Sequence, residues 1–240
     1  MNCEPGPVGM GRDSKGAEMK AIQMKQYGGP EQLEMVETPR PEPEAKQVLV
    51  RIAATSFNPV DPKRTSGVMR QIFPLQFPFT PGGDFSGVAE AVGREVSEFK
   101  AGDAAIGYSM AGGAYAEFIA TDADNVARKP KSVGDAEAAS LALVAQTALQ
   151  MLDRAGVKQG QTVLIHGAGG AVGGVAVQVA HLRGAKVIGT ASGPSQARVK
   201  EYGADEVIDY KTEKFEDRVK NVDAVLDTVG AKCSSARMVC

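Results

Sequence analysis

The sequence has no tryptophan, few aromatic residues and only three cysteines. Aromatic side chains make up 5% of the 240 residues, so a platform of rings for stacking nucleic-acid bases is not expected. The cysteines are Cys3, Cys233 and Cys240, and because none lies in the body of the chain, neither a disulfide framework nor a thiolate zinc site is predicted there. This usage of cysteine is typical of a reducing compartment, and we expect a cytoplasmic protein.

The chain also lacks long apolar runs and any excess of one charge. No stretch of 18 apolar residues is present, so no membrane-spanning helix is predicted. Lysine and arginine number 27 against 29 aspartate and glutamate residues, a balance that gives no reason to expect a nucleic-acid partner. Residues 1–18 include acidic residues and no apolar core of a signal peptide, and we expect them to form a disordered extension.

Glycine, by contrast, is abundant, with 28 residues, and it punctuates a first region of short strands. Between residues 19 and 134 only one short helix is expected, at 60–65. The pattern there is typical of a small, strongly bent β-barrel. The strands predicted in this region cover residues 47–58, 78–93, 101–109 and 112–122.

From residue 135 to residue 230 the pattern changes to alternating helices and strands. An alanine- and leucine-rich helix is predicted over 135–156, and short β-branched strands bounded by glycine follow it. This alternation predicts a parallel sheet that is buried on both faces. The strands are expected at 162–167, 186–192, 206–210 and 223–230, and the helices between them at 172–183, 195–202 and near 214–220. In residues 231–240 we find no periodic strand or helix.

A glycine-rich loop joins the first of these strands to its helix. Glycines at this place let the chain turn tightly and approach a pyrophosphate, which the free N–H groups and the positive helix end then hold. The loop therefore predicts a dinucleotide site, and the alternative is a tight structural turn in an α/β sheet. The loop consists of Gly167, Ala168, Gly169, Gly170, Ala171, Val172 and Gly173.

The end of the second strand favours NADPH over NADH. Enzymes that use NAD usually have an acidic residue here, bonded to the ribose 2′-hydroxyl. This strand ends instead in the small residues 189–193, and Ser192 could donate a hydrogen bond to a 2′-phosphate or cap the next helix. Arg198 and Lys200 are candidate basic partners, or simply solvated helix residues.

Six stretches of the sequence are specific in their order and spacing: SFNPVD (56–61), TPGGDFSGVAEAVG (80–93), GGAYAEF (112–118), TVLIHGAGGAVG (162–173), GADEVIDY (203–210) and VLDTVG (225–230). Together they resemble the medium-chain dehydrogenase/reductase superfamily and, within it, the zinc-independent quinone oxidoreductase-like group. The resemblance spans about residues 19–230. It implies a GroES-like catalytic domain over 19–134, followed by a doubly wound Rossmann domain that binds NADP over 135–230. It also implies reduction of a quinone or of the double bond of an α,β-unsaturated carbonyl by NADPH.

The resemblance also implies roles near the reacting end of the cofactor. Asn58 would lie by the nicotinamide and the substrate carbonyl, although an asparagine before Pro59 also suits a turn. Lys63 would be placed to polarise a carbonyl, or is a solvated lysine. Thr147 matches a threonine that meets the nicotinamide, with a hydroxyl bonded to its own helix as the alternative.

Three further residues are assigned to the cofactor in the same way. Tyr210 matches a tyrosine near the adenosine 2′-phosphate, and a packing role at the strand end is the alternative. Val229 and Gly230 end the fourth strand, beside the nicotinamide ribose.

A metal is not expected, although the zinc-dependent alcohol dehydrogenases belong to the same superfamily. Their catalytic zinc needs a cysteine and a His-Glu pair where this chain has residues 56–58 and Gly83-Asp84. His166 and His181 are expected to be structural. Transfer of hydride to a quinone or enone needs less help than oxidation of an alcohol, because the acceptor spreads the incoming charge onto its oxygen.

The resemblance predicts more chain than is present after the fourth strand. A full doubly wound sheet has six strands, and the family's chain then returns to the first domain. We therefore expect a truncated form with an exposed strand edge at 223–229, in which the truncation could impair turnover. A non-catalytic NADPH-binding or interaction protein is the main alternative, and a thioester enoyl reductase is a third. The expected partner is a small molecule, with a homodimer possible.

Overall fold

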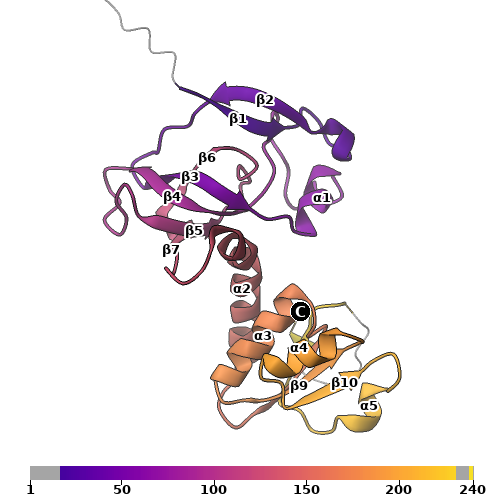
Figure 1. The fold of residues 1–240 in the computed structure, drawn as a ribbon. Coiled ribbons are helices and arrows are strands. Elements are labelled where there is room, and N and C mark those ends of the chain that lie inside the picture. Colours follow the sequence, from indigo (N-terminus) through magenta and orange to yellow (C-terminus); the bar gives the residue numbers. More distant parts are fainter. Residues whose placement is uncertain (1–16, 231–237, 240) are drawn as a thin grey trace, which may run out of the picture. The chain divides into compact units, whose positions relative to one another are not determined.

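A computed structural model describes residues 17–230 and 238–239 of the chain (Figure 1). It divides into two compact units between Ala139 and Ser140. This division falls inside the helix α2 (Asp135–Ala155), whereas the sequence suggested a boundary at the start of that helix. Of the predicted extension over residues 1–18, only Ala17 and Glu18 are described, and Glu18 already begins the first strand.

The first unit is built mainly from short strands, as their signals in the sequence predicted. It also contains the helix α1 (Val60–Thr65) and two short 3-10 turns, Pro30–Gln32 and Ala123–Asn125. The strands are β1 (Glu18–Gln23), β2 (Glu34–Pro39), β3 (Gln47–Thr55), β4 (Asp84–Val92), β5 (Ala104–Tyr108), β6 (Phe118–Asp122) and β7 (Val126–Arg128).

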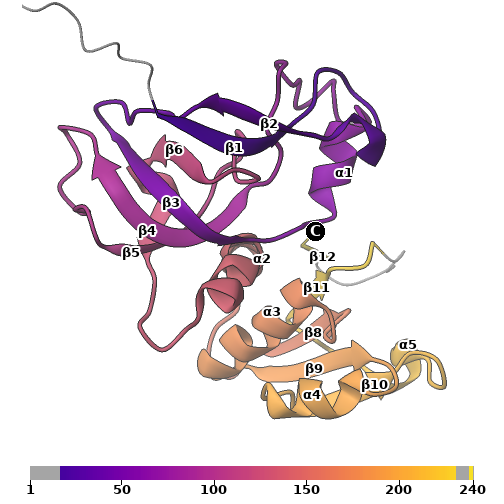
Figure 2. The same ribbon diagram turned by 45° about the horizontal axis from the view of Figure 1, so that its top comes forward.

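These strands form two antiparallel sheets (Figure 2). One has five strands in the order β6-β3-β4-β5-β7, and the other consists of β1 and β2. Isolated bridges from Ala21 to Ala116 and from Met24 to Phe79 connect the β1 segment to other parts of the unit. The pairing of β3 with β4 has two irregularities of register, between Leu49 and Val50 and between Ile52 and Ala54, as β-bulges produce.

The second unit alternates strands and helices as the sequence predicted. Its sheet is parallel, with the order β10-β9-β8-β11-β12, which corresponds to strands three, two, one, four and five of a doubly wound fold. After α2 the elements are β8 (Thr162–His166), α3 (Ala171–Leu182), β9 (Lys186–Ala191), α4 (Ser195–Glu201), β10 (Glu206–Asp209), α5 (Phe215–Arg218), β11 (Ala224–Asp227) and β12 (Met238–Val239).

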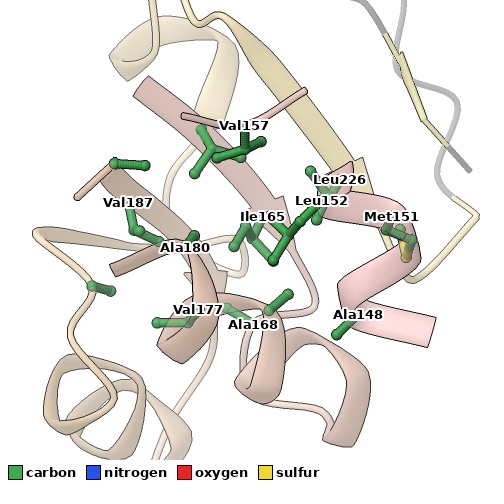
Figure 3. Packing of buried hydrophobic residues seen from close by; sticks show 14 of the residues in the cluster. Ala148, Met151, Leu152, Val157, Ile165, Ala168, Val177, Ala180, Val187 and Leu226 are labelled. Atoms are coloured by element: carbon green, nitrogen blue, oxygen red, sulfur yellow. The ribbon is translucent and has the colours of Figure 1, made fainter. Parts of the chain in front are cut away.

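Both faces of this parallel sheet are covered. Side chains at alternate positions, such as Ile165 and Leu226, pack with α2, α3 and α4 in the larger core (Figure 3). The intervening positions, such as Leu164 and Val225, pack on the other face with Phe215 of α5. This two-sided burial explains why the strands are short, apolar and β-branched without an alternation of polar residues.

The prediction of an open edge at the fourth strand is wrong. We expected no strand within residues 231–240, yet β12 pairs in parallel with β11, with Val225 opposite Met238 and Leu226 opposite Val239. A pair of residues is too short to produce a period in the sequence, so this strand could not be predicted. The rest of the predicted tail, residues 231–237 and 240, lies outside the described residues.

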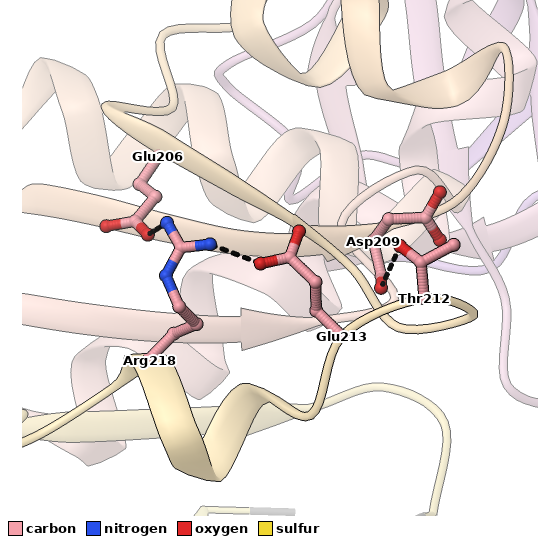
Figure 4. A network of polar contacts seen from close by, with 5 residues as sticks. All are labelled: Glu206, Asp209, Thr212, Glu213 and Arg218. Atoms are coloured by element: carbon pink, nitrogen blue, oxygen red, sulfur yellow. Dashed lines mark hydrogen bonds and ion pairs between the residues drawn. The ribbon is translucent and has the colours of Figure 1, made fainter.

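A polar network holds the turn after β10 (Figure 4). The guanidinium of Arg218 donates to Glu206 at 2.8 Å and also bonds Glu213. The hydroxyl of Thr212 donates to the carbonyl of Asp209 at 3.4 Å. Exposed ion pairs of this kind contribute little to stability individually, but together they fix the connection between β10 and α5.

In the described part of the chain, no helix is both long and apolar enough to cross a membrane.

Truncating a leucine in the larger core should destabilise the second unit much more than truncating a surface leucine. Leu152 is fully buried, whereas Leu182, also helical, is 83% exposed. We expect L152A to lower the free energy of unfolding by about 2–5 kcal/mol through lost burial and a residual cavity. We expect L182A to change it by about 0.5 kcal/mol at most. Denaturant unfolding followed by circular dichroism measures both, and equal losses would contradict the packing described.

Candidate functional site

The glycine-rich loop runs from the end of β8 into the start of α3, as predicted. Gly167 has a φ of +67°, a conformation that side chains rarely allow. The loop is tied to the neighbouring strand, because the N–H of Ala168 donates to the carbonyl of Thr190 at 3.0 Å. The N–H of Gly170 closes the turn by donating to the carbonyl of Gly167 at 2.9 Å.

Two more glycines of the loop lie where a side chain would collide with its surroundings. A Cβ on Gly173 would meet the backbone of Gly167 well inside contact distance. A Cβ on Gly169 would lie 2.7 Å from the Cβ of Ser195. These positions therefore need glycine for close packing of the loop, and the tight-turn alternative accounts for this part of the motif.

The loop also has free donors, which a merely structural turn does not need. The N–H groups at the start of α3 make no hydrogen bond to any residue that the structure describes, and no acidic residue lies in the first turn. Such groups at the positive end of a twelve-residue helix suit a phosphate or diphosphate. The free N–H groups belong to Gly169, Ala171, Val172 and Gly173.

A cavity of about 300 Å³ borders the loop within the second unit. Gly169, Gly170, Gln178 and Arg198 contribute to its lining. The guanidinium of Arg198 donates to the carbonyl of Gly169 at 3.0 Å, so this side chain contacts the loop rather than being only a solvated helix residue.

The two hydroxyl residues predicted to meet a 2′-phosphate lie together. The hydroxyl of Ser192, just after β9, donates to the Tyr210 hydroxyl after β10 at 3.0 Å. Ser192 does not cap α4, which has no side-chain cap, and Tyr210 is too exposed for a packing role. An acid that the sequence analysis did not weigh, Asp209, lies beside them, with one carboxylate oxygen bonded to the Gln196 side chain at 2.7 Å.

The residues predicted at the nicotinamide end of the cofactor are bonded locally. The hydroxyl of Thr147 donates to the carbonyl of Leu143 at 2.8 Å, which is the helix-internal alternative. The N–H groups of Val229 and Gly230 both donate to the same carboxylate oxygen of Asp227, at 2.9 and 3.0 Å. Contacts of these three residues with a cofactor stay predictions.

In the first unit, Asn58 belongs to a buried cluster of polar side chains. Its side-chain amide donates to the carboxylate of Asp84 at 2.7 Å, and the hydroxyl of Ser56 bonds the same oxygen. Asp84 is fully buried, at the start of β4. The cluster occupies the positions where the zinc-dependent relatives were expected to have cysteine and a His-Glu pair.

A second carboxylate fixes the backbone of Asn58. Asp61 accepts the Asn58 N–H at 2.8 Å and the hydroxyl of Tyr115 at 3.2 Å. Burial raises the pKa of the Asp61 carboxyl, while the hydrogen bond from Asn58 acts in the opposite direction. Burial, followed by the charge of Asp61, also raises the pKa of Tyr115.

Lys63 differs from its neighbours on α1, because its side chain is exposed and bonds none of the described residues. This exposure fits a solvated lysine as well as it fits a catalytic lysine, and the catalytic role of Lys63 stays a prediction. The sequence analysis missed the roles of Asp61 and Tyr115 and weighed Asp84 only as a metal ligand. The signal in the sequence that could have pointed to a buried acid was an acidic residue among apolar or small neighbours.

The described residues hold no group of three or more histidine, cysteine, aspartate or glutamate side chains that could bind a metal, and none of the three cysteines is among them. His166 is buried, with Nδ1 3.2 Å from the Thr190 hydroxyl, while His181 is exposed on α3. The two imidazoles thus have different surroundings.

Two family models match this chain. One, described as the alcohol dehydrogenase GroES-like domain, covers residues 44–131. The other, described as zinc-binding dehydrogenase, covers residues 171–239. They correspond to the first unit and to most of the second.

Individual proteins of known name are also similar. A chloroplast envelope quinone oxidoreductase homolog of Arabidopsis thaliana is 41% identical over 82% of this chain and 63% of its own length. A 2-methylene-furan-3-one reductase of Solanum lycopersicum is 37% identical over 93% of this chain and 60% of its own length. The chain thus spans less than two thirds of these curated relatives.

A solved structure gives the same result over the fold. Escherichia coli quinone oxidoreductase, crystallised in complex with NADPH, is 31% identical, with a TM-score of 0.76, over 89% of this chain and 67% of the other. Order of motifs, fold and identity agree, and the chain belongs to the quinone oxidoreductase-like group of the medium-chain dehydrogenase/reductase superfamily.

Proposed function

We propose that this protein binds NADPH and transfers hydride from it to a quinone or to the double bond of an α,β-unsaturated carbonyl, without zinc. The observation that supports the proposal most strongly is the row of N–H groups at the start of α3 that have no partner among residues 17–230 and 238–239. These groups fit the diphosphate of a dinucleotide, and the crowded glycines leave the loop backbone uncovered toward it. The relative from Escherichia coli was crystallised with NADPH.

The preference for NADPH over NADH rests on the ends of β9 and β10. Ser192 and Tyr210 present hydroxyls there, and no carboxylate stands at the end of β9. Hydroxyls can donate to a 2′-phosphate, whereas a carboxylate would repel it. The nearest acid, Asp209, already accepts the Gln196 amide and the N–H of Lys211.

The buried cluster in the first unit would orient the acceptor. When bound, the cofactor supplies a hydride, which a conjugated carbonyl takes up by spreading charge onto its oxygen. Asp84 and Asp61 hold the side chain and the backbone of Asn58, so its amide is fixed before a substrate enters. The amide nitrogen also has a long contact of 3.4 Å to the Ser56 hydroxyl, which a substrate carbonyl oxygen would replace, and an amide N–H placed there would stabilise the developing charge.

Absence of zinc from the reaction is part of the proposal and is supported by the donor set. Ser56 and Asn58 offer a neutral hydroxyl and a neutral amide, and both are bonded to Asp84. Catalytic zinc is usually held by three side chains of cysteine, histidine or acidic type, and this cluster contains one.

The names of the relatives support a small-molecule acceptor, because one is a quinone oxidoreductase homolog and another a 2-methylene-furan-3-one reductase. We also propose a reducing, cytoplasmic compartment from the scarcity of cysteine, and a possible homodimer. A non-catalytic NADPH-binding protein is the outcome that binding without turnover would indicate.

Titration of the purified chain with NADPH and NADH, followed by nucleotide fluorescence, tests the proposal. We expect tighter binding of NADPH, and its oxidation when an ortho-quinone or a simple enal is added. A chelator should leave the rate unchanged. Tighter binding of NADH would contradict the assignment of the 2′-phosphate site, and loss of turnover with the chelator would contradict a zinc-free reaction.

Adding one methyl group to the loop should abolish tight nucleotide binding. A Cβ at Gly173 would collide with the backbone of Gly167, so G173A must shift the loop. We expect the Kd for NADPH to rise about tenfold or more, the loss of one or two charge-assisted hydrogen bonds. G134A is the matched control, because its added methyl group meets the flexible end of the Glu137 side chain. An unchanged Kd in G173A would refute the role of the loop.

Removing the oriented amide should affect turnover and not nucleotide binding. We expect N58A to lower kcat by about a hundredfold, as for loss of a donor to a developing oxyanion, and to leave the Kd for NADPH within about twofold. N125A, which removes another asparagine of the first unit that bonds a neighbouring side chain, serves as the control. Equal kcat in N58A and the native chain would exclude Asn58 from the reaction.

A further inference from the structure

The end of β8, from which the glycine loop starts, is tied by hydroxyl groups to the strands on both sides. On one side, Thr190 of β9 has its Oγ1 3.3 Å from the N–H of Gly167 and 3.2 Å from Nδ1 of His166. On the other side, the hydroxyl of Thr228 donates to the carbonyl of His166 at 2.8 Å. The first residue of the loop is therefore anchored through side chains as well as through the sheet.

These anchoring groups are shielded from water. Thr190 is 3% exposed and His166 is 5% exposed. The ring of Phe215 packs edge-on against the imidazole, with the ring centres 4.6 Å apart. Water therefore competes little for the Thr190 hydroxyl, and losing one of its partners leaves a buried polar group unsatisfied.

The hydrogen-bond inventory allows Thr190 to accept from Gly167 and donate to His166 at the same time, and the tautomer of the imidazole decides the second direction. A threonine hydroxyl has one hydrogen to donate and lone pairs that accept. Since the Gly167 N–H can only donate, Thr190 accepts from it and has its hydrogen available for His166. Nδ1 can accept that hydrogen only when the imidazole is neutral and its proton is on Nε2.

We infer that Thr190 is a positioning residue that holds the glycine loop in its nucleotide-binding form, and that the neutral imidazole of His166 fixes the direction of its hydroxyl. The inference rests on the proposed nucleotide-binding function. The inference gives the buried His166 a structural role, whereas a zinc-free reaction gives this histidine no role as a metal ligand. Thr190 and His166 act through Gly167 and need not touch the cofactor.

Protonation of His166 should weaken this support. A proton on Nδ1 would turn the ring nitrogen into a second donor toward the Thr190 oxygen, so the hydroxyl would lose the acceptor for its own hydrogen and would have to reorient. Burial lowers the pKa of His166, while the charges that face it, Asp227 at the end of β11 and Glu216 on α5, act in the opposite direction. We expect the native loop geometry at neutral pH and its loss as the pH falls below the ordinary histidine range.

The first test compares variants of Thr190 in calorimetric titrations with NADP⁺ at neutral pH. T190V keeps the shape and removes the hydroxyl, and should raise the Kd about three- to tenfold, the worth of one hydrogen bond. T190S restores the hydroxyl and should bind within about twofold of the native chain. T121V is the matched control, a threonine that is 5% exposed and accepts a hydrogen bond from Asn125 in the first unit. Equal Kd values in T190V and the native chain would overturn the inference.

A second variant and a change of pH separate positioning from a general loss of stability. H166F keeps the ring contact with Phe215, removes the acceptor and should raise the Kd as T190V does. Between about pH 7.5 and pH 5.5 the native chain should lose affinity relative to T190V, which lacks the hydroxyl that the proton redirects. Asp227, Glu216 and the nucleotide phosphates are present in both chains, so an identical pH dependence would overturn the role of His166.

Amide hydrogen exchange in the nucleotide-free chain tests the inference apart from the proposed function. The N–H of Gly167 should exchange faster in T190V than in the native chain, and T190S should restore the slow rate. Equal rates in all three would overturn the inference even if NADP⁺ binds. If the native chain bound no nucleotide, the proposed function would fail, and the exchange rate of Gly167 would still decide whether Thr190 positions the loop.

Discussion

The second unit is organised around a set of backbone N–H groups that no residue of the described chain satisfies. The first turn of α3 has N–H groups with no partner within the described chain, and Gly173 and Gly169 allow the loop to pack tightly without covering them. A helix start of this kind is satisfied by water or by an anion. The loop that carries these donors starts from β8, which has strands on both sides in the parallel sheet.

In the first unit, by contrast, the polar groups around Asn58 are hydrogen-bonded to one another. Asp84 and Asp61 accept hydrogen bonds from both ends of Asn58, and Ser56 completes the set. Buried carboxylates are costly unless donors surround them, so this arrangement both stabilises the turn after β3 and presents one oriented amide. One acid, an amide and a hydroxyl thus stand where the zinc-dependent relatives were expected to have metal ligands.

Local sequence patterns predicted those features that arise from near neighbours in the chain. Short periods and turn chemistry predicted the alternation of strands and helices after residue 135, the glycine loop and the end of β9. The fold confirms the class that these features indicated. The contacts of Asp61 with Tyr115 and of Thr190 with His166 join distant segments, so no spacing predicts them. The two-residue strand β12 has no period to detect.

The central claim is that the amides at the start of α3 hold the diphosphate of NADPH. Nuclear magnetic resonance of the nitrogen-15-labelled chain, with NADPH added stepwise, tests it most directly. We predict that the amide signals of Gly169, Ala171, Val172 and Gly173 shift downfield the most, as new charge-assisted hydrogen bonds form. Binding of NADPH that left these signals in place, and moved those of other residues instead, would contradict the account.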